Sequence, residues 1–213
     1  MEGLERGFIS NNWVIMLFVF GLLLIFFLKL FKAAKLRGYA ASVFNKGFIE
    51  IESQEKTPPI TFFHSVFTLF SFLSISMTVY FLFTGYREEL NTDFFEYVKW
   101  AFYILIYILG RFLVEFVLMS LLQIKSLLSY FILSKRSYLY SISIGLFLLN
   151  FIYFYGYRSQ IFLLIGTIIL FGMRLLLILN NNKNLIIKEL FYFILYICAF
   201  EIAPLLILFK LIF

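Results

Sequence analysis

Four ionisable residues lie inside apolar stretches of this sequence, where a charge at mid-bilayer costs at least about 2.5–3.5 kcal/mol. They are Arg111, Glu115, Arg174 and Glu201, and their formal charges cancel. Arg111 and Glu115 stand at positions i and i+4, so they share one face of a helix. Such a set can clamp helices together, dock another protein within the membrane, or relay protons or ions. The cancelling charges favour the clamp, because a relay more naturally leaves one carboxylate without a fixed counter-charge.

Glu201 has a proline close by on the same predicted helix. Pro204 cannot donate a backbone hydrogen bond to the carbonyl of Phe200, so it is predicted to kink the helix there. A kink beside a buried carboxylate occurs where helices open onto a cavity, and it also occurs as a simple packing bend. Cys198, the only cysteine, is expected to be a small packing residue.

A second apolar stretch carries polar side chains at steps of mostly three and four residues. This polar stripe consists of Thr61, His64, Thr68, Ser71, Ser74 and Thr78. Stripes of this kind usually form hydrogen bonds between neighbouring membrane helices. His64 is the only histidine, and its predicted position near the cytoplasmic interface favours a packing residue over a metal ligand.

Motifs of catalysis and of cofactor binding are missing from the sequence. It contains no glycine-rich phosphate loop, no paired histidines at metal-binding spacing and no Gly-x-Ser-x-Gly. No catalytic residue, metal or cofactor is therefore predicted. The net charge of +6 does not indicate nucleic-acid binding, because basic residues are expected in the cytoplasmic loops of membrane proteins.

The elements that would position these residues follow from composition. Hydrophobic residues make up 63% of the 213 residues and charged residues 14%, whereas soluble domains carry about 25% charged residues. Several apolar runs approach the roughly 20 residues that cross a bilayer. We therefore expect an all-α polytopic membrane protein, a single transmembrane domain over residues 1–213. The predicted spans are 13–31, 60–84, 99–122, 138–155, 161–179 and 190–213.

Loop charges predict the orientation, with both termini on the periplasmic side. That choice leaves few basic residues outside, namely Arg6, Arg87, Lys99, Arg158 and Lys210. It places most of them inside, namely Lys29, Lys32, Lys35, Arg37, Lys46, Lys56, Lys125, Lys135, Arg136, Lys183 and Lys188. The first span is expected to be retained, because no cleavage pattern precedes it. Short interfacial helices are predicted on the cytoplasmic side, the clearest over Ile124–Leu133.

Three stretches of the chain resemble an uncharacterised inner-membrane protein family of Bacteroidota, a domain of unknown function. They are residues 107–123, residues 130–155 and the motif Phe191-Tyr-Phe-Ile-Leu-Tyr-Ile-Cys-Ala-Phe-Glu-Ile-Ala-Pro204, the most specific of the three. The resemblance covers most of the chain. It implies an inner-membrane location and brings no established activity.

Together these features predict a non-enzymatic, multi-pass subunit of a larger assembly in the bacterial inner membrane, serving cell-envelope biogenesis or protein export. Its expected partners are other inner-membrane proteins and membrane lipids. A proton- or ion-coupled transporter component is the first alternative, based on the buried Arg/Glu set. A small lipid-modifying enzyme is the second, based on location alone.

Overall fold

The computed structural model describes residues 12–42, 47–48, 52, 61–86, 94–121 and 125–181. For residues 85–86, 111–112, 114–121, 125–132 and 181 it describes the backbone alone. Within these ranges the chain is helical and contains no strand. The helices are α1 (Asn12–Ala40), α3 (Phe62–Tyr86), α4 (Phe94–Leu121), α5 (Lys125–Tyr155) and α6 (Gln160–Asn181). The expected all-α fold is confirmed.

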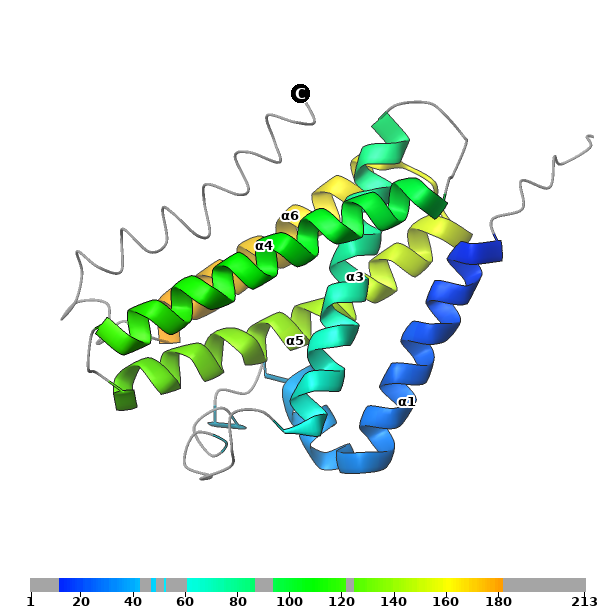
Figure 1. Cartoon of the computed structure of the whole chain (residues 1–213). Coiled ribbons are helices and arrows are strands. Elements are labelled where there is room, and N and C mark those ends of the chain that lie inside the picture. Colours follow the sequence, from blue (N-terminus) through cyan, green and yellow to red (C-terminus); the bar gives the residue numbers. More distant parts are fainter. Residues whose placement is uncertain are drawn as a thin grey trace, which may run out of the picture.

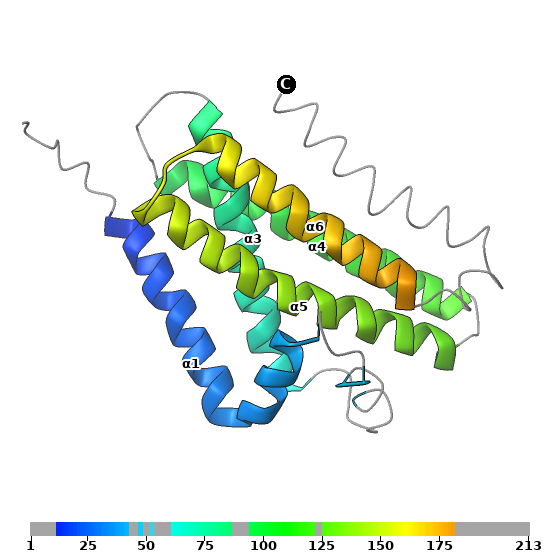
Figure 2. The same cartoon turned by 180° about the vertical axis from the view of Figure 1, so that it is seen from behind.

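Helix α3 occupies the middle of the bundle, where it contacts α1, α4, α5 and α6 (Figure 1). Seen from behind, α5 and α6 run side by side, and α1 packs against α5 (Figure 2). A short turn over residues 156–159 joins α5 to α6, so these two helices are antiparallel neighbours. Because every other described helix packs on α3, side chains on α3 determine how the bundle is held together.

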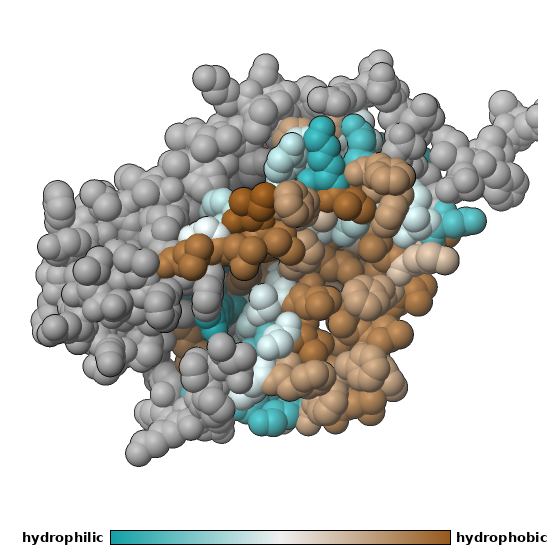
Figure 3. Space-filling model, viewed as in Figure 1, coloured by the Kyte–Doolittle hydropathy of each residue, from teal (hydrophilic) through white to brown (hydrophobic). Residues whose placement is uncertain are grey.

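Four helical segments are long and apolar enough to cross a membrane. They are Asn12–Ala40, Phe62–Thr84, Leu133–Tyr155 and Gln160–Asn180. They contain the predicted first, fourth and fifth spans and all but the first two residues of the second, and hydrophobic side chains dominate the surface over α1 (Figure 3). The predicted third span lies on α4 except for its last residue, and the predicted sixth, 190–213, lies outside the described residues. The fold is therefore that of a membrane protein.

Helix α1 bends sharply after its apolar part. The backbone at Lys32 is not helical (φ −151°, ψ 75°), and the following residues turn back toward α3 and α5 (Figure 1). Two hydrogen bonds hold the returning segment on α5, from Ser141 Oγ to the Ala40 carbonyl (2.9 Å) and from Ser42 Oγ to the Ser137 carbonyl (3.4 Å). The apolar part thus ends where the first span was predicted to end.

The prediction of a separate interfacial helix over Ile124–Leu133 differs from the structure. Helix α5 runs unbroken from Lys125 to Tyr155, about 46 Å at 1.5 Å per residue. The prediction rested on length, because a third span that continued unbroken to Leu133 would be too long for the bilayer. In the structure Ser137 Oγ donates to the Leu133 carbonyl (2.8 Å), a bond that a helix accommodates internally, and no glycine or proline interrupts residues 125–144.

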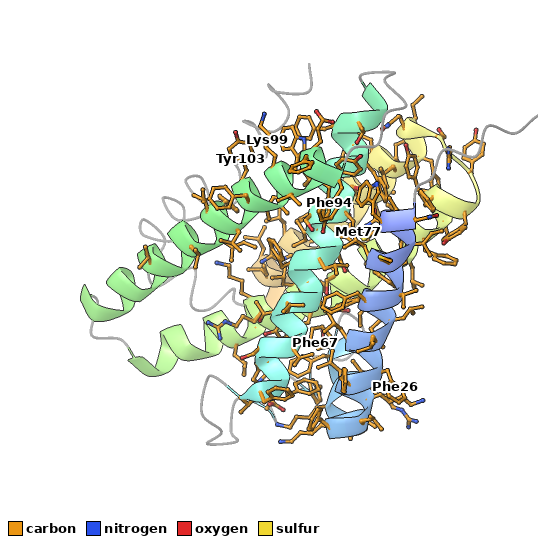
Figure 4. All side chains as sticks on the ribbon, turned by 45° about the vertical axis from the view of Figure 1, so that its right-hand side comes forward. Phe26, Phe67, Met77, Phe94, Lys99 and Tyr103 are labelled. Carbon is orange, nitrogen blue, oxygen red and sulfur yellow. The ribbon has the colours of Figure 1, made fainter. Side chains whose placement is uncertain are left out.

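The core between α1, α3 and α5 is largely aromatic. Phe67 and Met77 of α3 are buried inside the bundle, whereas Phe26 of α1 points outward (Figure 4). Gly21 of α1 lets the two backbones approach, because a Cβ there would lie 2.4 Å from the Phe147 ring of α5. Phe147 cannot move easily, since the Phe18 and Phe70 rings lie 5.6 and 5.3 Å from it.

Candidate functional site

Most of the polar stripe of α3 lies against α5, where polar side chains of α5 meet it. We call this interface the α3–α5 seam. It comprises Thr68, Ser71, Ser74 and Thr78 of α3 and Tyr140, Ser143 and Asn150 of α5. All of these side chains except the exposed Thr68 are buried. The seam therefore concentrates hydroxyl and amide groups inside an otherwise apolar bundle.

One half of the seam consists of hydroxyl pairs. Thr68 Oγ1 and Tyr140 Oη are 3.0 Å apart, and Ser71 Oγ donates to Ser143 Oγ at 3.0 Å. Tyr140 Oη also lies 3.3 Å from the carbonyl of His64. Each pair joins the two helices, so the pairs set both the register and the rotation of α3 on α5.

The other half centres on Asn150, a fully buried side chain. Its Nδ2 donates to the carbonyl of Ser74 (3.1 Å) and to Thr78 Oγ1 (3.0 Å). Thr78 Oγ1 in turn donates to the Ser74 carbonyl at 2.8 Å, which completes a closed polar unit. Sequence reasoning missed Asn150. Its spacing from Ser143 was the available signal, because positions i and i+7 fall on one helical face.

We expect Asn150 and Thr78 to be energetically coupled. Asn150→Leu keeps the shape of the side chain and removes the amide, and Thr78→Val removes only the hydroxyl. A double-mutant cycle of unfolding in mixed micelles should give a coupling of about 0.6 kcal/mol and at most about 1.7 kcal/mol. Strictly additive losses would show that the observed contact contributes nothing to stability.

Two further bonds connect α3 to the remaining helices. Ser76 Oγ lies 3.0 Å from Tyr97 Oη of α4, and Gln160 Nε2 at the start of α6 donates to the Phe81 carbonyl (3.0 Å). Ser76 lies outside the predicted stripe, so this link to α4 was also missed. Polar bonds thus tie the central helix to α4, α5 and α6.

At one end of the seam, the α1–α3–α5 junction brings three rings together. Tyr39 lies 5.5 Å from Tyr140 and 5.8 Å from His64, and the His64 and Tyr140 rings stack at 6.1 Å. The structure therefore places His64 among aromatic rings. Thr61 lies just before α3, where its carbonyl accepts from the Ser65 amide (3.1 Å).

An ion pair holds the segment after α1 against this junction. Lys35 Nζ lies 2.7 Å from Glu52 Oε1, with 18% of the lysine side chain and 3% of the glutamate side chain exposed. Glu52 lies in a stretch that the sequence indicated only as a connection. Its burial shows that part of this connection packs on the bundle.

The predicted buried charge network is described only in part. Arg174 of α6 is 3% exposed. Arg111 and Glu115 lie on α4, which keeps them one turn apart on one face, but their side chains are outside the described set. Glu201, Pro204 and Cys198 lie outside the described residues. Among the residues that are described, no three His, Cys, Asp or Glu side chains gather as a metal site would require.

Comparison with known proteins gives one result. A family described as a domain of unknown function, DUF4271, matches residues 14–212, nearly the whole chain. No curated protein and no solved structure shows a significant match. The matched region contains helix α1 from its third residue onward and the other four described helices in full. The chain belongs to the DUF4271 family, a domain of unknown function.

Proposed function

We propose that this chain is a non-enzymatic, multi-pass subunit of a larger inner-membrane assembly. The observation that supports this most is the composition of the α3–α5 seam. Its buried polar side chains bond to one another and to backbone carbonyls across two helices. Such groups fix the shape of a scaffold, whereas a catalytic site needs groups that remain available to a substrate.

Helix α4 supplies the surface on which we propose that another membrane protein packs. Phe95, Phe102 and Leu113 are exposed along it, and in Figure 4 Lys99 and Tyr103 point away from the bundle. At Gly110 no described atom lies within 4 Å of the place that a Cβ would take. A small residue on an open helix face permits close approach of a second helix. At Gly21, by contrast, the Phe147 ring of α5 already occupies the space that a Cβ would take.

Purification of the tagged chain from native membranes in mild detergent tests this proposal. We expect a membrane protein to co-purify in a fixed ratio with wild type, and in a much lower ratio with Gly110→Leu, which should retain the wild-type unfolding temperature. Gly21→Leu should instead lower the unfolding temperature, because it forces a side chain into the Phe147 ring. A chain that purifies alone under these conditions contradicts the subunit proposal.

We further place this assembly in cell-envelope biogenesis or protein export, since the chain has no predicted soluble domain and acts within the membrane. Depletion of the chain should then reduce the level of outer-membrane or secreted proteins before growth stops. Unchanged levels at the onset of growth arrest would argue against this role.

A component of a proton- or ion-coupled transporter is the second candidate. The burial of Arg174 within an apolar helix favours it, because charged residues at membrane depth often belong to ion pathways. Asn150 adds a buried amide whose Oδ1 accepts no hydrogen bond from the described residues. The two functions make opposite predictions for Glu201→Gln, which should lose assembly in a scaffold and keep it in a relay.

The orientation with six spans and both termini outside the cytoplasm belongs to the same proposal. We expect cysteines at Lys46 and Lys183 to be shielded from an impermeant thiol reagent in intact cells, and a cysteine at Glu89 to react. The Cys198→Ser background removes the native thiol. Labelling of the two lysine positions without permeabilisation would reverse the orientation.

A further inference from the structure

The α1–α3–α5 junction carries basic side chains directly beside its aromatic rings. Lys35 precedes Tyr39 by four residues, and Arg136 precedes Tyr140 by four, so each cation lies one helical turn from a ring on the same face. Because the Tyr39 and Tyr140 rings are 5.5 Å apart, the two basic positions lie on neighbouring faces of α1 and α5. Basic side chains therefore lie next to the aromatic rings of this junction.

Contacts at the start of α3 bring these basic positions near one another. Arg136 lies one turn before Tyr140, whose Oη is 3.3 Å from the His64 carbonyl, and Phe31, the neighbour of Lys32, packs on Phe62, two residues before His64. Glu52 pairs with Lys35. Neither Lys32, which is exposed, nor Arg136, which is half-buried, has an ion pair among the described residues. Among the described residues, positive charge therefore exceeds negative charge at the junction.

The junction also stands at the end of the apolar segments. Lys32 directly follows the predicted first span, which ends at Phe31, and the α3 span begins at Phe62. Phe31 and Phe62 meet there with ring centroids 5.0 Å apart, and Leu30 and Phe27 are exposed just below. Basic groups at this level face lipid headgroups, while the exposed apolar side chains beneath them face acyl chains.

We propose that Lys32, at the kink of α1, and Arg136, one turn before Tyr140, bind the phosphate of an anionic phospholipid headgroup. The guanidinium of Arg136 offers paired donors to phosphate oxygens, and Lys32 adds a mobile charge at the kink. The acyl chains lie along the exposed apolar face of α1. A general excess of basic residues in cytoplasmic loops explains the number of cations here. It does not explain their convergence on three packed rings with a buried carboxylate.

Lipid titration of the purified protein tests the site. Phosphatidylglycerol added to protein in a neutral detergent should raise the unfolding temperature, and phosphatidylcholine should not. Lys32→Gln should weaken the apparent affinity for phosphatidylglycerol about fivefold, and Lys32→Gln with Arg136→Gln about thirtyfold. In the Lys32→Gln background, Arg136→Lys should weaken the affinity for phosphatidylglycerol less than Arg136→Gln does, because lysine keeps the charge but lacks the paired donors.

The matched control removes one lysine and one arginine elsewhere in the bundle, Lys99 near the start of α4 and Arg158 in the turn between α5 and α6. Lys99→Gln with Arg158→Gln should bind phosphatidylglycerol like wild type. An equal loss in this control would overturn the site, since it would reveal attraction by net charge alone. Stabilisation by phosphatidylcholine to the same extent would overturn it too. If inorganic phosphate at millimolar concentration stabilised the protein equally well, the site would be one for free anions and the lipid proposal would be wrong.

Lys32 is exposed at a non-helical position, so Lys32→Gln provides a variant that should fold normally. Its unfolding temperature without lipid, compared with that of wild type, separates loss of binding from loss of structure. An unchanged affinity in this folded variant would contradict the proposed role of Lys32.

Discussion

Replacing Arg174 by leucine is expected to lower the free energy of unfolding by about 3–5 kcal/mol. Arg174 is 3% exposed within an apolar helix. A guanidinium persists at membrane depth only where other groups hold it. Leucine fills most of the same volume, so the loss does not arise from a cavity. It arises because the groups that held the guanidinium stay buried without their counter-charge.

Unfolding of Arg174→Leu in mixed micelles, followed by helical circular dichroism, measures the loss. Arg158→Leu is the matched control, because Arg158 lies exposed in the turn before α6, with its guanidinium carbon 5.4 Å from the centre of the Phe154 ring. Its replacement should change stability by at most about 1 kcal/mol. Similar losses in the two variants would show that burial of Arg174 does not determine its contribution.

The spans that the sequence predicted correctly share one physical cause. A bilayer demands about 20 consecutive apolar residues, and such runs can be read without knowledge of their neighbours. The end of the first run at Phe31 coincides with the non-helical Lys32 for this reason. The return of the chain after Lys32 was not predictable, because it depends on bonds to Ser137 and Ser141 of a helix about 95 to 101 residues away.

Helix α5 continues through a polar run that is typical of a loop. Of the four polar residues at 134–137, Ser137 bonds within the helix, and Ser134 and Lys135 are buried against the bundle. A hydroxyl can bond to the carbonyl four residues earlier, so serine ends a membrane helix less reliably than proline does. The sequence pattern could not distinguish these cases, because burial decides between them.

The sequence predicted the α3 side of the candidate site but not the α5 side. Steps of three and four residues indicated which α3 side chains share a face, but no spacing rule indicates which helix covers that face. Tyr140 and Asn150 therefore emerged only from the structure. The same limit applies to Arg174, whose burial is shown but whose proposed pairing with Glu201 still rests on the predicted depths of the two residues.

Glu201→Gln is expected to separate a scaffold from a proton relay. In the scaffold, Glu201 remains ionised because Arg174 or Arg111 lies within roughly 4–6 Å and favours the charged carboxylate. Glutamine removes the counter-charge, so both the unfolding temperature and the recovery of co-purified partner should fall. In a relay, Glu201 exchanges protons without a fixed partner. Glutamine would then leave a stable and assembled protein that has lost its function.

The measurement combines thermal unfolding, co-purification from native membranes and growth of the same strains. Glu96→Gln serves as the control, since Glu96 lies in the first turn of α4, ahead of the predicted span that begins at residue 99. We expect Glu201→Gln to lose assembly, and Arg174→Leu with Glu201→Leu to recover part of the stability that each single change removes. A buried ion pair replaced as a whole by apolar side chains is often tolerated. Normal assembly of Glu201→Gln in cells that fail to grow would refute the scaffold and favour transport.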